Sequence, residues 1–177
     1  MRKYIVLFFC ICFLGLMVQA ANVSAAEQPP NLADIQKFAE RGVDEAQVML
    51  ATMYAYGHGA PQDYAKAAYW YQKAIEQGKT DRRPFSEANL LLSEMYAAGL
   101  GVLKNEAKAS QLQQKAVQGF KKFAEQGDAY AQCALGGMYV TGKGVVSDRK
   151  QGCGLLRKSA EQGFKRGIDL YREFCAK

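Results

Sequence analysis

Residues 139–148 read YVTGKGVVSD, and this stretch decides the fold because its pattern occurs three times in the chain. Residues 54–63 read YAYGHGAPQD and residues 96–105 read YAAGLGVLKN. In each copy two glycines follow a tyrosine at fixed spacing, while the residue between the glycines changes from His to Leu to Lys. A phosphate-binding loop is expected once, between a strand and a helix. Recurrence therefore predicts a tight glycine turn.

Apolar residues at helical spacing precede each turn. An alanine eight residues and a leucine four residues before the tyrosine fall on one helical face with it. These positions are Ala46, Leu50 and Tyr54; Ala88, Leu92 and Tyr96; and Ala131, Leu135 and Tyr139. Each turn is followed by an expected N-cap of a second helix: Asp63, Asn105 or Asp148. We expect this second helix to end at a glycine in the left-handed conformation: Gly78, Gly119 or Gly163. The unit is helix A, turn, helix B.

We place these units at residues 43–78, 85–119 and 128–163, with half-units on either side. The segment KFAERG at residues 37–42 matches the end of a B helix, with Asn31 as an N-cap signal, and GIDLYREFC at residues 167–175 predicts a last A helix that closes the stack. Eight added residues after Gly119 can extend that B helix by about two turns.

The repeating unit resembles the Sel-one-like repeat (SLR) family, a relative of the tetratricopeptide repeats. The resemblance rests on the pattern A-x-x-x-L-x-x-x-Y-x-x-G-x-G, which is followed by an Asp or Asn cap and then by K-A-x-x-x-G. The resemblance covers nearly all of the chain from about residue 31 to residue 175, and Trp70 stands at the family's tryptophan position. It implies an all-α fold: a right-handed α-solenoid of helix-turn-helix repeats. Gly152 and Gly154 should each weaken the third B helix by about 1 kcal/mol relative to alanine.

The N-terminal 26 residues predict a secretory signal peptide. Arg2 and Lys3 precede an apolar run from Tyr4 to Val18, and small residues allow cleavage after residue 20, 25 or 26. Fifteen residues span about 22 Å as a helix, too short for a stable membrane span. We therefore expect a periplasmic or secreted protein with one solenoid domain at residues 27–177. Its 21 basic and 17 acidic side chains are interleaved, which does not indicate nucleic-acid binding.

Three cysteines follow the predicted signal peptide, and an oxidising compartment would pair two of them. The turn before the last A helix is centred near Phe164, so Cys153 faces a position close to Cys175 across the antiparallel pair. Cys133 instead faces about Leu156. We predict a Cys153–Cys175 disulfide and a buried free thiol at Cys133, with a reactive thiol as the alternative.

No catalytic or metal-binding constellation is visible, so we predict no catalytic residue, metal ligand or cofactor. His58 is the only histidine and should be exposed at a turn tip. The recurrent aromatic residues are assigned to packing: Tyr54, Tyr96, Tyr139 and Trp70. Tyr56 and Tyr69 lie outside the recurrent set and are available to a partner.

A helical solenoid without catalytic residues works through its surface, and its A helices are expected to line a concave groove. We predict a protein-interaction or adaptor module that binds a protein or peptide; the oligomeric state is left open. The proposed partner-binding residues are non-recurring positions of the A helices expected to point outward: Gln47, Val48, Thr52, Asn89, Leu90, Glu94 and Gln132. The resemblance implies adaptor roles in assembly, signalling, or bacterial virulence and host contact.

Two other functions stay open. Some cysteine-rich secreted relatives are described as binding or slowly hydrolysing β-lactams, which makes a β-lactam- or peptidoglycan-binding protein the first alternative. Those relatives carry a cysteine pair in most repeats, and this chain does not. An immunity-type inhibitor of a secreted effector is the second, because it too needs only a rigid surface.

Overall fold

The computed structural model describes residues 31–77 and 82–176, so the predicted signal peptide and Gly78 lie outside the described residues. Within those ranges the chain forms helices and no strand, which confirms the all-α prediction. The helices are α2 (Leu32–Glu40), α3 (Asp44–Tyr56), α4 (Tyr64–Glu76), α5 (Arg83–Ala98), α6 (Glu106–Glu125), α7 (Ala129–Thr141), α8 (Arg149–Glu161) and α9 (Lys165–Phe174). No described helix is both long enough and apolar enough to cross a bilayer.

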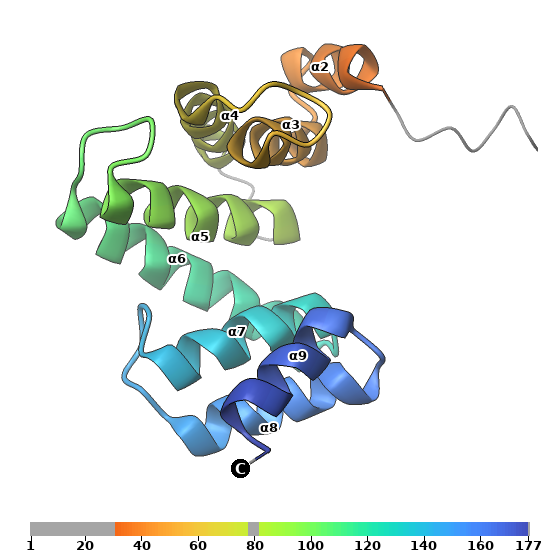
Figure 1. Ribbon diagram of the computed structural model, residues 1–177, viewed down its shortest axis with the longest axis vertical. Helices are drawn as coiled ribbons and strands as arrows, with labels where there is room; N and C mark the ends of the chain where they lie inside the picture. Colours follow the sequence, from red (N-terminus) through yellow and green to blue (C-terminus); the bar gives the residue numbers. More distant parts are fainter. Residues whose placement is uncertain (1–30, 78–81, 177) are drawn as a thin grey trace, which may run out of the picture.

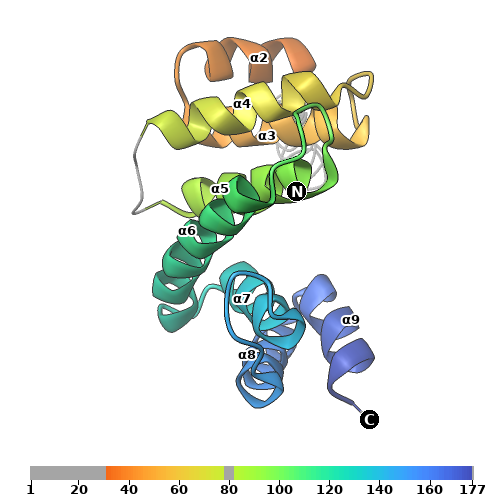
Figure 2. The same cartoon turned by 90° about the vertical axis from the view of Figure 1, so that its left-hand side faces the viewer.

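Helices that follow one another in the sequence pack against each other, so the molecule is a stack of antiparallel pairs (Figures 1 and 2). The A helices are α3, α5, α7 and α9, and the B helices are α2, α4, α6 and α8. The largest buried cluster joins α3, α4, α5 and α6, and a second joins α6 and α7. The recurrent tyrosines Tyr96 and Tyr139 are buried, and Tyr54 and Trp70 pack against the core, which confirms their packing role.

The glycine turns also join one repeat to the next. Gly57, Gly99 and Gly142 end their A helices in the left-handed conformation. In the second and third turns the second glycine packs on the preceding B helix: a Cβ on Gly101 would overlap the Tyr64 carbonyl group at the start of α4, and one on Gly144 would crowd Gln113 of α6. Only glycine allows this approach, and the φ of 67° at Gly101 suits glycine as well.

The helix caps follow the prediction with one exception. Asp63, Asn105 and Asp148 each accept a hydrogen bond from a backbone N–H in the first turn of the B helix. Gly163 has a positive φ at the end of α8. The prediction that Gly119 ends its helix is wrong, because α6 runs on to Glu125 and Gly127 takes the left-handed position. The added residues therefore extend α6, as expected.

The disulfide prediction is confirmed: Cys153 in α8 is bonded to Cys175 at the end of α9, with a Cα–Cα distance of 5.6 Å, and Cys133 is a buried free thiol. The prediction that Gly152 weakens α8 needs correction. A Cβ at Gly152 would lie 2.8 Å from the Gly136 carbonyl oxygen of α7, so the missing side chain lets the two helices approach closely.

Candidate functional site

A groove of about 350 Å³ lies between the A helices α5, α7 and α9. It lies where neighbouring A helices separate. Helix α3 contacts α5, and α7 contacts α9, but α5 and α7 face each other across the groove. The prediction that A helices line a groove is thus confirmed for these three.

Two facing helical stripes form the groove walls. On α5, Leu90, Leu91 and Glu94 line it, and on α7 the lining residues include Tyr130, Ala134, Gly137 and Thr141. The α7 spacing of four, three and four keeps those residues on one helical face. Ala134 and Gly137 are small, so the middle of this wall recedes and gives the groove its depth.

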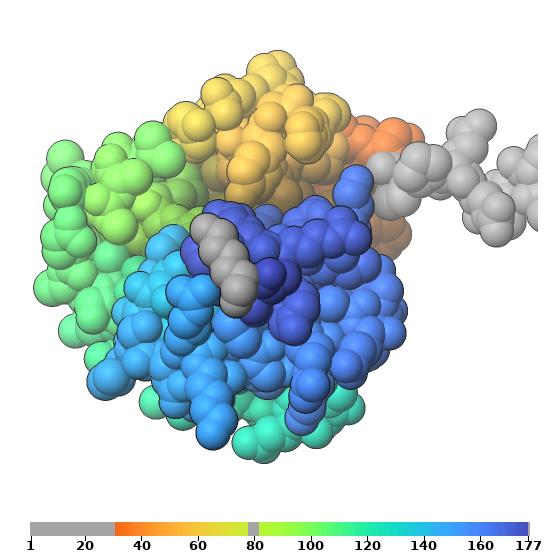
Figure 3. Space-filling view, turned by 60° about the horizontal axis from the view of Figure 1, so that its bottom comes forward, coloured from red at the N-terminus to blue at the C-terminus, as the bar shows by residue number. Residues whose placement is uncertain are grey.

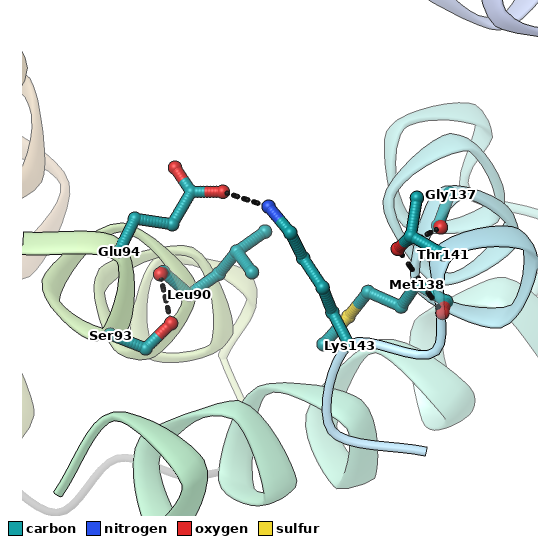
Figure 4. A network of polar contacts seen from close by, with 7 residues as sticks. All are labelled: Leu90, Ser93, Glu94, Gly137, Met138, Thr141 and Lys143. Atoms are coloured by element: carbon teal, nitrogen blue, oxygen red, sulfur yellow. Dashed lines mark hydrogen bonds and ion pairs between the residues drawn. The ribbon is translucent and has the colours of Figure 1, made fainter. Parts of the chain in front are cut away.

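A polar contact bridges the groove at one end. There Lys143, in the turn after α7, donates from Nζ to Glu94 Oε1 of α5 at 3.2 Å (Figure 4). Both side chains are about half exposed, so this pair is worth less than about 1 kcal/mol and can open at little cost. Figure 4 also shows Leu90 and Met138 beside the pair, on opposite walls.

The Tyr130 end of the groove lies beside the Glu87 carboxyl group of α5. Burial raises the pKa of Glu87 above its ordinary value, and the Arg83 guanidinium partly offsets this shift. Burial likewise raises the pKa of Tyr130. Arg83 also lies over the Tyr130 ring, 5.1 Å from its centroid, so this end of the groove is a compact polar and aromatic cluster.

The third wall is α9, the last A helix. The residues that line the groove from this side are Arg166, Leu170, Glu173 and Phe174. Leu170 lies close to Gly137 of α7. The groove therefore combines an apolar interior with charges of both signs at its edge.

A more open hollow of about 410 Å³ lies between α3 and the start of α5. Its lining includes Met49, Met53, Thr52, His58 and Pro84. Met49 and His58 are exposed, and the exposure of His58 confirms its predicted position at a turn tip. Methionines adapt to varied partners because their side chains are flexible and polarizable.

The predicted partner-binding residues divide into two groups. Leu90 and Glu94 line the groove, and Thr52 is half-buried beside the hollow. The expectation that the others point outward is wrong, because four of them are buried: Gln47, Val48, Asn89 and Gln132. Val48 belongs to the largest core cluster, although it also forms part of the floor of the hollow.

Hydrogen bonds explain why the two glutamines are buried. Gln132 Nε2 donates to the Ala124 carbonyl oxygen at the end of α6, and Gln132 Oε1 accepts from Gln162 Nε2 of α8 at 2.8 Å. The first repeat has the same relay, in which Gln47 links the Ala39 carbonyl to Gln77. Each relay joins an A helix to the B helices on both sides.

Sequence reasoning missed most of the α7 and α9 walls. Residues at positions 130, 134, 137 and 141 have helical spacing, but two of them are alanine and glycine, which carry no binding signal on their own. Which side of α7 is exposed could be identified only once it was known that α6 and α8 pack against its other sides.

The groove contains a free thiol, that of Cys133. Cys133 lies at its floor, where burial raises the pKa of the thiol despite the opposing charge of Arg166, so the thiol stays protonated and weakly nucleophilic. Across residues 31–77 and 82–176, no group of three or more His, Cys, Asp or Glu residues is placed to hold a metal ion.

The solved structures similar to this chain include two helical repeat proteins. A Sel1 repeat protein from Oxalobacter formigenes is 28% identical, with a TM-score of 0.53, and the match covers 82% of this chain and 54% of that one. This chain thus spans about half the length of that protein. A protective antigen with an SLR fold from uropathogenic Escherichia coli strains is 27% identical, with a TM-score of 0.44, over 75% of this chain and 33% of its own.

A search of curated proteins found no match. The Sel1 repeat pattern, however, matches residues 44–79, 86–128 and 129–164, which together make up more than half of the chain. These segments contain the three complete helix pairs of the stack. The chain belongs to the Sel1 repeat family.

Proposed function

We propose that this protein is a periplasmic or secreted interaction module that binds a segment of a partner protein in the groove between α5, α7 and α9. The observation that carries the proposal is the groove itself: an apolar trough closed at one end by the weak Glu94–Lys143 pair. A peptide inserted there would bury apolar side chains against Leu90, Met138 and Leu170.

Export is part of the proposal. The N-terminal residues have the charge and apolar pattern of a signal peptide, and disulfides such as Cys153–Cys175 persist mainly in oxidising compartments. The mass of the protein recovered from the periplasm or medium tests this point, because cleavage after residue 20, 25 or 26 gives three distinct masses.

Site-directed photocrosslinking tests the groove. A photoreactive residue replaces Thr141, which is exposed in the groove wall, or Tyr69, which is exposed on α4 outside both hollows. We expect a defined protein adduct from position 141 in the native envelope and none from position 69. The captured protein, once purified, should bind Thr141→Arg at least tenfold more weakly than the parent.

Two outcomes count against the groove. One is an adduct pattern that is the same from positions 141 and 69. The other is a saturable thermal shift with β-lactams or peptidoglycan fragments that Thr141→Arg abolishes, which would favour the ligand-binding alternative.

A further inference from the structure

The basic character of this protein is concentrated at its C-terminal end. Residues 149–177 contain eight lysines and arginines and three acidic residues, whereas residues 27–148 contain thirteen and fourteen. The excess positive charge after the predicted signal peptide thus belongs almost entirely to α8 and α9. These helices form much of the near face in Figure 3, where residues 145–176 are light to dark blue.

Helix α8 directs its cations to solvent. Gly152, Leu156 and Ser159 are buried, and the opposite half of the helix carries three exposed cations, Lys150, Arg157 and Lys158. Arg149 is exposed as well, but it donates to the Phe174 carbonyl at the end of α9. Within residues 31–77 and 82–176, Arg157 is the one of these that forms an ion pair with an acidic side chain, that of Glu161 at 3.8 Å. Gly154 lies between Lys150 and Arg157, with open space where its Cβ would be. Gly154 therefore leaves a gap among the positive charges of this face.

An exposed aliphatic side chain adjoins this face. Val146 lies in the turn that leads into α8 and is 90% exposed. The side chain of Val146 makes no contribution to the core packing. In this turn the contact with the buried cluster of α6 and α7 is made by Val145. Cations beside a protruding aliphatic side chain suit a surface that is anionic outside and apolar just beneath.

We propose that the exposed face of α8, with Val146 at its edge, docks on an anionic phospholipid bilayer. The lysines and arginines would lie at the phosphate level, and Val146 would enter the boundary between headgroups and acyl chains. The phosphate backbone of a nucleic acid would use the cations but offers no apolar layer for Val146. This inference does not depend on the occupant of the groove, which is formed by A helices.

Vesicle co-sedimentation tests the proposal. The processed protein is mixed with vesicles of phosphatidylcholine alone, or of phosphatidylcholine and phosphatidylglycerol in equal parts. We expect binding only to the second kind, and less of it as salt is raised. Lys150→Gln with Lys158→Gln removes two surface cations and should weaken binding about 25-fold, at about fivefold for each cation. Val146→Asn keeps every charge and should also weaken binding.

The matched control is Lys66→Gln with Lys73→Gln on α4, which removes the same charge from exposed positions at the other end of the stack. Equal loss of binding in the control pair overturns the proposal, as does equal binding to the two kinds of vesicle. If labelled duplex DNA or polyglutamate binds with the same dependence on Lys150 and Lys158 while the vesicles do not bind, the lipid assignment is wrong.

Discussion

Gly152 and Gly154 lie two residues apart in α8 but have opposite surroundings. Gly152 faces α7, where a Cβ would lie 3.0 Å from the Val140 backbone nitrogen, while Gly154 faces open space. Gly152→Ala should therefore destabilise the protein by about 1 to 3 kcal/mol, because the helices must separate. Gly154→Ala should stabilise it by up to about 1 kcal/mol through helix propensity. Urea unfolding of the two variants gives both values, and effects of the same sign would contradict this account.

Gln132 is a structural residue in this account, although its sequence position suggested a partner contact. Gln132→Met keeps the volume but removes the donor to the Ala124 carbonyl and the acceptor for Gln162. We expect a loss of about 1 to 3 kcal/mol in the free energy of unfolding, since a buried carbonyl loses its partner. A variant of unchanged stability but weaker partner binding would restore the original interpretation.

Glu87 should make stability depend on pH. Its raised pKa means that the folded state favours the protonated carboxyl group. The stabilisation is complete below the ordinary pKa of 4.5 and is lost as the pH rises through the higher folded-state value. Glu87→Gln cannot ionise, so its stability relative to the parent should improve between pH 4.5 and neutrality. Urea unfolding across this range tests the sign, and a constant difference between the two proteins would contradict it.

At the scale of the element, α9 depends on its disulfide. It is the last described helix, and Gly167 is its one buried residue. The bridge from Cys153 to Cys175 fixes the far end of α9, and the Arg149 guanidinium donates to the Phe174 carbonyl nearby. Since α9 is a wall of the groove, the disulfide also maintains the groove.

Replacing Cys153 and Cys175 together by serine should lower the free energy of unfolding by about 3 kcal/mol, the amount expected for a bridge that closes a loop of this length. Hydrogen exchange in α9 should accelerate more than exchange in α5. Cys133→Ala is the control that keeps the bridge. If α9 exchanges at the same rate in the parent and the serine variant, packing alone holds it.

At the scale of the whole molecule, each helix pair contacts mainly its neighbours, so stability should vary along the stack. Helices α5, α6 and α7 are covered by others before and after them, whereas α2 and α9 are covered on one side. We expect native-state hydrogen exchange to be slowest in α5 to α7 and fastest in α2 and α9. Uniform protection along the chain would instead indicate a single cooperative unit.

The sequence by itself determined the repeating unit, its turns and its caps. Those features depend on residues close together in the chain, such as the glycine pairs and the Asp or Asn that follows each turn. The disulfide was also predictable, because Cys153 and Cys175 lie on consecutive helices whose register is set by the short turn between them.

Only the tertiary structure decided which faces of the A helices stay open. An A helix packs against B helices from two repeats, which buries Gln47 and Gln132 at positions that look free in one helical hairpin. The groove depends on how far α5 and α7 separate, and its depth depends on Ala134 and Gly137. Residues that act by being small are recognised only when the side chains around them are in place, since their effect is the space they leave.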